Sequence, residues 1–197
     1  MFIQTEETPN NNALKFLPGV EVSTAGPVFY NDPKEVKNDS ILALKLFQIE
    51  GVTKIFYGYD FITVTKEDSL SWEIIKPEIL MTMMDHFVSG LPVFNEQKVT
   101  GFVIDIESLS EIEKQIVEII ETRVRPSVAM DGGDIIYKEF KDGTVYLELR
   151  GACSGCPSST ITLKNGIESM LQHFVPEVKA VEAVTVEGES IKKQATP

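Results

Sequence analysis

The sequence predicts an α+β protein of two small α/β domains, each a short, mostly hairpin-built sheet packed against two helices. Runs with strand character alternate with amphipathic helical runs, and turn signals join two pairs of strands into hairpins. A chain of 197 residues is long for one small domain and comfortable for two. The predicted fold is therefore two sheet-and-helix units joined by a linker.

The predicted boundary lies in the middle of the chain, where Gly90-Leu91-Pro92 interrupts the helical pattern. We expect a first domain over residues 1–92, a linker over residues 93–106, a second domain over residues 107–188 and a tail over residues 189–197.

In the first domain, Asp39 or Ser40 is predicted to cap one helix, and a second helix is expected from about Ser71 to His86. Pro77 lies inside that second span, so the helix either starts near Lys76 or is kinked. The expected strands cover residues 13–17, 28–30, 52–57 and 61–65.

The second domain is predicted to open with a helix, because Ser108 with Glu111, and Ser110 with Glu113, each fit the capping-box pattern. This helix is expected to end before Pro126. The expected elements that follow are a hairpin of residues 135–140 and 144–149, a helix over residues 157–172 and a closing strand over residues 178–186.

The composition argues against several classes of partner. A net charge of -12 and a pI of about 4.6 disfavour binding to nucleic acid or to an anionic membrane surface. No apolar run reaches the ~18 residues that span a bilayer. Residues 1–12 are polar, acidic and free of Arg, so they match neither a secretory signal nor a mitochondrial presequence. Two cysteines do not make a secreted disulfide framework, so a reducing cytoplasm is expected.

The two cysteines, Cys153 and Cys156, are separated by two residues and lie between a strand-like run and a helix-like run. Pro157 suits the first position of a helix, which places Cys156 at or near the N-cap. Free backbone N–H groups and the positive end of the helix dipole lie beside such a residue. A thiolate there has a lowered pKa and is ready to bind a metal or attack a disulfide.

The flanking residues favour a ligand or redox turn over a packing turn. Gly151 and Gly155 allow the loop to turn tightly and bring backbone N–H groups near the sulfurs. The alternative is a pair of buried structural cysteines, since cysteine is common in protein cores. A loop flanked by glycine and serine is a poor place to bury them.

Other residues allow two interpretations each. The turn at residues 131–134 either packs under the cysteine loop or contacts a partner, or it serves turn geometry alone. His86 and His173 are metal ligands by residue type, but neither has ligand spacing to the cysteines, so surface or helix-end positions are expected. Arg150 either offsets the charge of a bound anionic cluster or forms a surface ion pair.

One chain supplies two thiolates, whereas a metal site needs about four ligands. Three outcomes stay open: a dithiol redox centre, a zinc ion shared by two chains, or an iron–sulfur cluster shared by two chains. The cluster fits the turn best, because N–H groups and glycines accommodate a soft, sulfur-rich anion. A site split across a dimer is also easily opened, which suits a cluster that is handed on.

Residues 108–186 resemble the NifU-like C-terminal domain, also called the Nfu domain. The resemblance is carried by Arg125-Pro126, Asp131-Gly132-Gly133-Asp134, Val145-Tyr146-Leu147, Gly151-Ala152-Cys153-Ser154-Gly155-Cys156-Pro157-Ser158-Ser159, Thr162-Leu163-Lys164 and Gly166-Ile167-Glu168. The first half resembles the Nfu N-terminal domain through Phe16-Leu17-Pro18-Gly19, Leu46-Phe47, Gly51-Val52 and Asp60-Phe61-Ile62-Thr63-Val64-Thr65-Lys66. A Cys-x-x-Cys pair alone is weak evidence, whereas these segments in this order are specific.

The resemblance implies an iron–sulfur cluster scaffold or carrier that is not an enzyme. It implies a [4Fe–4S] cluster, built of iron and sulfide, bound between two protomers with Cys153 and Cys156 of each chain as the ligands. The implied partners are cluster-donating assembly proteins and apo iron–sulfur recipients, with the first domain in partner recognition and a homodimer in the loaded state. No nucleic acid or membrane is implied, and a bacterial cytoplasmic location is expected.

The alternative function is a thiol–disulfide oxidoreductase that uses a Cys153–Cys156 disulfide. Redox pairs of the thioredoxin type also follow a strand and open a helix. Those proteins usually carry a bulky aromatic residue before the first cysteine, where this chain has Gly151 and Ala152. The two hairpin strands before the loop also lack the βαβ unit of such proteins.

Overall fold

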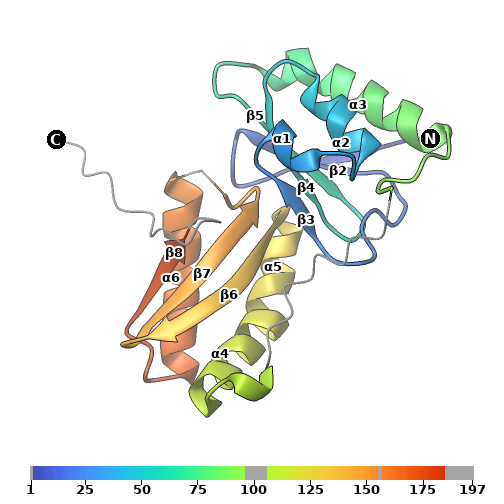
Figure 1. Cartoon of the computed structure of the whole chain (residues 1–197). Helices are drawn as coiled ribbons and strands as arrows, with labels where there is room; N and C mark the ends of the chain where they lie inside the picture. Colours follow the sequence, from blue (N-terminus) through green and yellow to red (C-terminus); the bar gives the residue numbers. More distant parts are fainter. Residues whose placement is uncertain (1, 96–105, 155–156, 185–197) are drawn as a thin grey trace.

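The computed structural model describes residues 2–95, 106–154 and 157–184. Within these residues, five strands form one sheet in the order β1-β2-β5-β4-β3, and three strands form a second sheet in the order β6-β7-β8. Each sheet carries its own helices and its own hydrophobic core (Figure 1). Two small sheet-and-helix domains confirm the predicted α+β class.

The first sheet is antiparallel throughout. Its strands are β1 (Gln4–Glu7), β2 (Ala13–Leu17), β3 (Val28–Tyr30), β4 (Val52–Tyr57) and β5 (Ile62–Lys66). Its helices are α1 (Pro33–Val36), α2 (Ile41–Phe47) and α3 (Trp72–Val88). Strand β1 was not predicted, because its side chains are polar and mostly exposed at the edge of the sheet and show no alternation.

Both larger helices of the first domain begin at a serine cap. The Ser40 hydroxyl accepts a hydrogen bond from the Ala43 N–H at 3.1 Å, which confirms the predicted cap. Helix α3 begins at Trp72 and continues through Pro77, so it does not start near Lys76. Its buried residues are Ile75, Ile79, Met83 and His86, which pack over the sheet.

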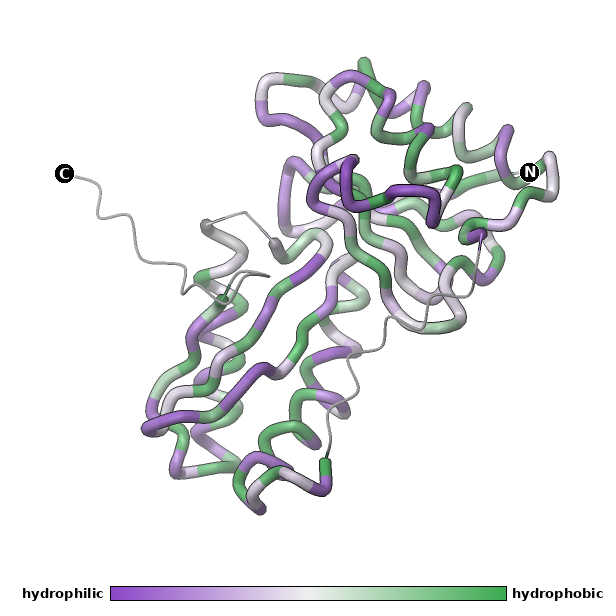
Figure 2. Tube along the Cα trace, viewed as in Figure 1, coloured by the Kyte–Doolittle hydropathy of each residue, from purple (hydrophilic) through white to green (hydrophobic). Residues whose placement is uncertain are grey.

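The second sheet combines an antiparallel hairpin with a parallel strand. Its strands are β6 (Gly133–Lys141), β7 (Thr144–Gly151) and β8 (Ala180–Val184). The helical segments of this domain are η1 (Ile106–Ser108), α4 (Glu111–Ile119), the π-helical turn η2 (Ile120–Val124), α5 (Arg125–Met130) and α6 (Pro157–Phe174). Hydrophobic and hydrophilic residues alternate along these helices (Figure 2), and hydrophobic residues such as Ile116, Ile120 and Leu171 pack in the core.

The prediction that the first helix of this domain ends before Pro126 is wrong. The chain passes through the π-helical turn η2 and continues as α5, in which Pro126 occupies one of the first two positions. A proline is tolerated there because its missing N–H is not needed for a helical hydrogen bond. The extra residue of the π turn therefore lets the helical segment carry on to Met130.

No helix within the described residues is long and apolar enough to cross a membrane. Most of the predicted linker at residues 93–106 and all of the predicted tail at residues 189–197 lie outside the described residues.

The capping box at the start of α4 generates a test of stability. Ser110 Oγ accepts from the Glu113 N–H at 3.3 Å, and Glu113 Oε2 accepts from the Ser110 N–H at 3.0 Å. We expect Ser110→Ala to lower the free energy of unfolding by about 1 kcal/mol at pH 7. Ser169→Ala, on the exposed surface of α6, is the control and should change it little.

This contribution also depends on pH. The hydrogen bonds from Ser110 lower the pKa of Glu113 in the folded chain. A lowered pKa means that the stabilisation is present above the unfolded-state pKa and is lost as the pH falls through the lowered value. Urea denaturation of both variants at pH 7 and at about pH 3 should show the difference between Ser110→Ala and the parent shrinking in acid. The same difference in the free energy of unfolding at both pH values would contradict a stabilising role of the Ser110–Glu113 hydrogen bonds.

Candidate functional site

The cysteine loop leaves the end of β7 and leads into α6, which confirms the predicted strand-to-helix turn. Cys153 and Ser154 belong to the described part of the loop. Cys156 lies outside the described residues, so its predicted position at the N-cap stays a prediction.

Cys153 is buried, with 6% of its surface exposed, and it packs in the core of the second domain. Its sulfur lies over Gly133, where an added Cβ would come within 2.6 Å of Sγ. The expectation that the loop is not a packing turn is therefore wrong for Cys153. The physical reason is the missing side chain of Gly133, which opens room for the sulfur.

Burial determines the acidity of the Cys153 thiol. The pKa of Cys153 is raised to about 12, first by desolvation and then by the negative charges of Asp131 and Asp134. The predicted lowering by a helix N-terminus concerned Cys156 and is not seen at Cys153. At neutral pH the sulfur of Cys153 is therefore protonated, and a metal that binds it has to replace this proton.

The turn before β6 packs directly under the cysteine loop, which confirms one of its two predicted roles. Gly132 has a φ of 78°, a backbone conformation that favours glycine. Its carbonyl accepts from the Ala152 N–H at 3.1 Å. In the sheet register Gly133 pairs with Gly151, and a Cβ on Gly151 would lie 2.6 Å from the Gly132 oxygen. Glycines on both sides thus let the two segments touch.

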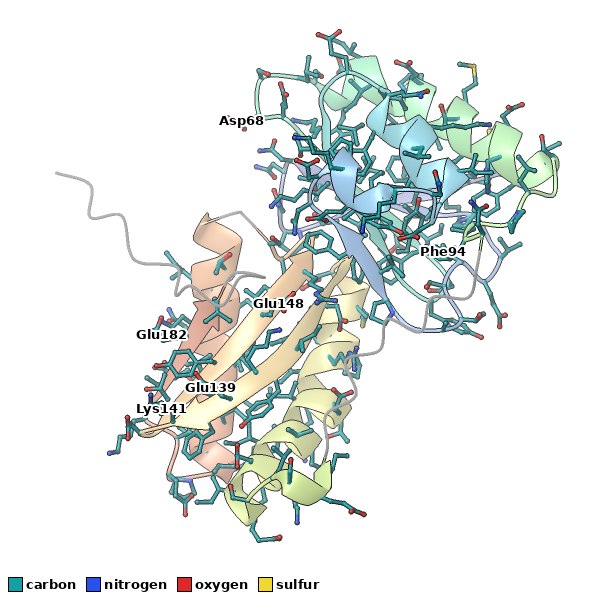
Figure 3. All side chains as sticks on the ribbon, in the orientation of Figure 1. Asp68, Phe94, Glu139, Lys141, Glu148 and Glu182 are labelled. Atoms are coloured by element: carbon teal, nitrogen blue, oxygen red, sulfur yellow. The ribbon has the colours of Figure 1, made fainter. Side chains whose placement is uncertain are left out.

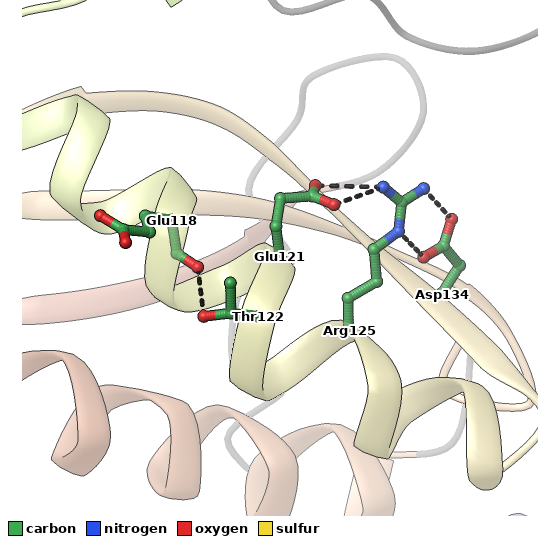
Figure 4. A network of polar contacts seen from close by, with 5 residues as sticks. All are labelled: Glu118, Glu121, Thr122, Arg125 and Asp134. Atoms are coloured by element: carbon green, nitrogen blue, oxygen red, sulfur yellow. Dashed lines mark hydrogen bonds and ion pairs between the residues drawn. The ribbon is translucent and has the colours of Figure 1, made fainter.

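A partly buried ion pair fixes the end of this turn. The Arg125 guanidinium donates from Nε to Asp134 Oδ1 at 2.7 Å and from a terminal nitrogen to Oδ2 at 3.0 Å (Figure 4). The same guanidinium contacts Glu121 one helical turn earlier. These carboxylates raise the pKa of Arg125 above its usual value. The planar, two-point pair holds the start of β6 against α5.

The first domain contributes side chains beside the cysteine loop that the sequence did not identify. Lys54 Nζ lies 3.3 Å from Ser154 Oγ, and Asn10 Nδ2 donates to the Ala152 carbonyl at 3.0 Å. The alternation along β5 places Thr63 on the face opposite the core. No local pattern in the sequence indicates that a second domain covers this face of the sheet.

The remaining candidates lie away from the loop. His86 is in the last turn of α3, as predicted, but it is fully buried rather than at the surface, and burial lowers its pKa. His173 lies in the last turn of α6, 4.8 Å from the ring of Phe174. In residues 2–95, 106–154 and 157–184, no group of three or more His, Cys, Asp or Glu side chains is arranged to hold a metal ion.

Arg150 forms an ion pair, as one of its two predicted roles required, but the pair is with a buried carboxylate and not at the surface. Its Nε donates to Glu148 Oε1 at 2.5 Å, and Lys138 Nζ pairs with the other oxygen of Glu148 at 2.6 Å. Glu148 lies on β7 (Figure 3), with 1% of its side chain exposed. Arg150 is therefore half-buried in a local charge cluster on the face of the sheet opposite the core.

Comparison with known proteins gives two family matches, and together they span most of the chain. Residues 3–90 match the model described as "Scaffold protein Nfu/NifU N terminal", and residues 116–182 match "NifU-like domain".

Curated relatives match over nearly the whole chain. The human protein "NFU1 iron-sulfur cluster scaffold homolog, mitochondrial" is 50% identical over 196 residues, which are 99% of this chain and 76% of that protein. The Drosophila persimilis protein of the same name is 46% identical over 93% of this chain and 65% of that protein. A solution NMR structure of a NifU-like protein from Saccharomyces cerevisiae is 31% identical over 49% of this chain and 86% of that chain, with a TM-score of 0.44.

The human and Drosophila relatives correct the expected location. They are mitochondrial proteins of animals, so the prediction of a bacterial cytoplasmic protein is wrong. That prediction rested on the polar residues 1–12. Because the chain spans only part of its relatives' length, its first residues say nothing about a targeting segment.

The contact between Gly133 and Cys153 generates a matched pair of variants. We expect Gly133→Ala to lower the free energy of unfolding by about 2 kcal/mol, because the new Cβ would meet both Cys153 Sγ and the Arg150 carbonyl oxygen. Gly166→Ala, in open space on α6, should instead raise it by about 1 kcal/mol. Urea denaturation of the reduced proteins measures both, and equal effects of the two changes would refute the close packing at Gly133.

Proposed function

Because the chain belongs to the Nfu/NifU family of scaffold proteins, we propose that it binds an iron–sulfur cluster as cargo and passes it to other proteins. In detail, the cargo is a [4Fe–4S] cluster held between two chains by Cys153 and Cys156 of each. The chain then acts as a scaffold and carrier and not as an enzyme.

The number of thiolates is the observation that carries this proposal. The whole chain has two cysteines, and the described residues hold no other cluster of metal-binding side chains. A [4Fe–4S] cluster takes four thiolate ligands. Two chains supply that number, and one chain does not. The loaded form is therefore a homodimer with the cluster between the two cysteine loops.

Loading and delivery are ligand exchanges without a change of oxidation state. On loading, the thiols of this chain replace the donor's thiolates on iron, and their protons pass to the thiolates that leave. On delivery, thiolates of the recipient replace those of the carrier, and the carrier thiols regain protons. The raised pKa of Cys153 means that protons compete strongly with iron for this sulfur, which fits a site that gives up its cargo.

The thiol–disulfide oxidoreductase alternative gains no support from Cys153. A redox nucleophile is accessible and has a lowered pKa. Cys153 is buried and its pKa is raised.

Recognition of an apo recipient protein is proposed for the first domain. On α3 the exposed apolar residues Ile74, Met81 and Val88 recur at intervals of seven and therefore share one face. Helix α3 lies on the side of the first domain away from the second (Figure 1). Exposed large apolar side chains on one helix face, such as this stripe, are typical of a protein interaction surface. The mitochondrial relatives support the same compartment for this chain and its partners.

Anaerobic loading with iron and sulfide tests the cluster site. Wild-type protein is expected to take up about four irons and four sulfides per two chains and to elute as a dimer. Cys153→Ala and Cys156→Ala should each take up none, whereas Ser154→Ala keeps both thiols and should load normally. Cys153→Ala should stay folded at a loss of about 1 kcal/mol, since its sulfur packs in the core. A monomer that carries a complete cluster would refute the shared site.

Delivery tests the stripe on α3. We expect Met81→Lys to slow cluster transfer to an apo recipient enzyme by about tenfold, because a charge disrupts an apolar contact. Cluster uptake should not change. Phe2→Lys, a similar change at a residue that is 80% exposed and lies outside the stripe, is the control. Equal transfer rates for both variants and the parent, measured as recovered recipient activity, would remove the stripe from the proposal.

A further inference from the structure

The two faces of the first sheet are covered by different parts of the molecule. Helices α2 and α3 cover the face that carries Leu14, Phe16 and Val64 (Figure 1). The opposite face carries Lys15, Thr63 and Phe56, which lie side by side across β2, β5 and β4 in the sheet register. We call this row, together with Asn10 and Lys54, the outer face of the first sheet.

The outer face is buried although no helix of its own domain covers it. Thr63 is 0% exposed, Phe56 is 2% exposed and Lys15 is 8% exposed. The second domain lies against this side of the sheet, with the ends of β6 and β7 nearest to it (Figure 1). The second domain therefore completes the burial of these side chains, which also contact Glu6, Phe29 and Phe61 of their own domain.

Three hydrogen bonds across this interface share one chemical pattern, in which a side chain of the first domain donates to a backbone carbonyl of the second. The contact of Lys54 Nζ with Ser154 Oγ differs, because its acceptor is a side chain. Thr63 Oγ1 donates to the Gly132 carbonyl at 2.7 Å, and Asn10 Nδ2 donates to the Ala152 carbonyl at 3.0 Å. Lys15 Nζ donates to the Met130 carbonyl at 3.2 Å. Met130 ends α5, so its carbonyl is at the negative end of the helix and favours a cation.

Glycines make the approach close enough for these hydrogen bonds. A Cβ added at Gly132 would lie 2.9 Å from Thr63 Oγ1, and one added at Gly151 would lie 3.0 Å from the Phe56 ring. The same two glycines shape the cysteine loop and the turn beneath it. The outer face thus fits the loop that carries Cys153 and not an unrelated part of the second domain.

We propose that the outer face of the first sheet is an interaction surface for the cysteine loop of its own chain in the unloaded state, and that it detaches when a cluster is loaded. The second half of this proposal rests on the proposed function, in which the cysteine loops of two chains face each other across one cluster. A loop covered by its own first domain leaves no room for the loop of a second chain. Loading therefore exchanges an intramolecular contact for an intermolecular one.

The reactivity of lysine side chains in the full chain reports directly whether the outer face is covered. Lys15 is 8% exposed, and its Nζ contacts the Met130 carbonyl of the second domain as well as Glu6 and the Phe61 ring of its own domain. Lys66 is 7% exposed within the first domain, where its Nζ donates to Asn12 at 2.9 Å. Lys37 is exposed. Brief acylation of metal-free, reduced protein, followed by mass spectrometry, should label Lys15 and Lys66 slowly and Lys37 fast.

Two variants separate opening of the interface from loss of fold. Thr63→Arg should open the interface and raise the labelling of Lys15 about fivefold or more, the factor that corresponds to one net hydrogen bond, and leave Lys66 slow. Thr82→Arg, on α3 at the other face, should change neither lysine. If Lys66 also reacts fast in Thr63→Arg, this variant is unfolded. The labelling of Lys15 in Thr63→Val, which loses the hydrogen bond but keeps the shape of the side chain, then tests the interface instead.

Three results would overturn the proposal. The first is fast labelling of Lys15 in the wild-type, unloaded chain. The second is slow labelling of Lys15 in a folded Thr63 variant. The third is slow labelling of Lys15 in the dimer loaded anaerobically with iron and sulfide, where we expect fast labelling. A chain that takes up no cluster refutes the proposed function alone, since the unloaded protein still decides whether the outer face binds the cysteine loop.

Discussion

The close backbone approach between the start of β6 and the end of β7 is the constraint on which the rest of the second domain depends. Gly133 and Gly151 face each other in the register, and the Gly132 carbonyl accepts from Ala152. Because these positions have no side chains, the turn and the loop enclose Cys153 between them. The pair of Arg125 with Asp134 holds this arrangement from the helical side. The same approach leaves carbonyls at the surface, where the first domain reaches them.

Local signals in the sequence predicted those elements that local interactions determine. The capping box of Ser110 and Glu113, the hairpin of β6 and β7 and the glycine turn at Gly132 all lie where the sequence placed them. The edge strand β1 and the continuation of the helix past Pro126 were missed, because pairing with β2 and a π-helical turn decide them. The helix and strand propensities of single residues predict neither the pairing of β1 with β2 nor the π-helical turn.

The environment of the candidate site was harder to predict than its position. The Cys-x-x-Cys pattern located the loop, but the burial of Cys153 depends on the core of the second domain and on Gly133, twenty positions earlier. His86 shows the same limit, since its place at a helix end did not reveal that it faces the core. Burial decides the sign of a pKa shift, and burial is a tertiary property. For that reason the sequence located the cysteine loop but did not reveal that burial raises the pKa of Cys153.

The chemistry of the interdomain contact divides unequally between its two sides. The donors at Asn10, Lys15 and Thr63 are side chains, and the acceptors at Gly132, Ala152 and Met130 are peptide oxygens. Every amino acid retains its carbonyl, so Ala152 or Met130 can be exchanged for many other residues without removing an acceptor. A single exchange at Thr63 removes a donor outright. Exchange is thus tolerated at Ala152 and Met130, and it is restricted at Thr63 and at the glycines that permit the close approach.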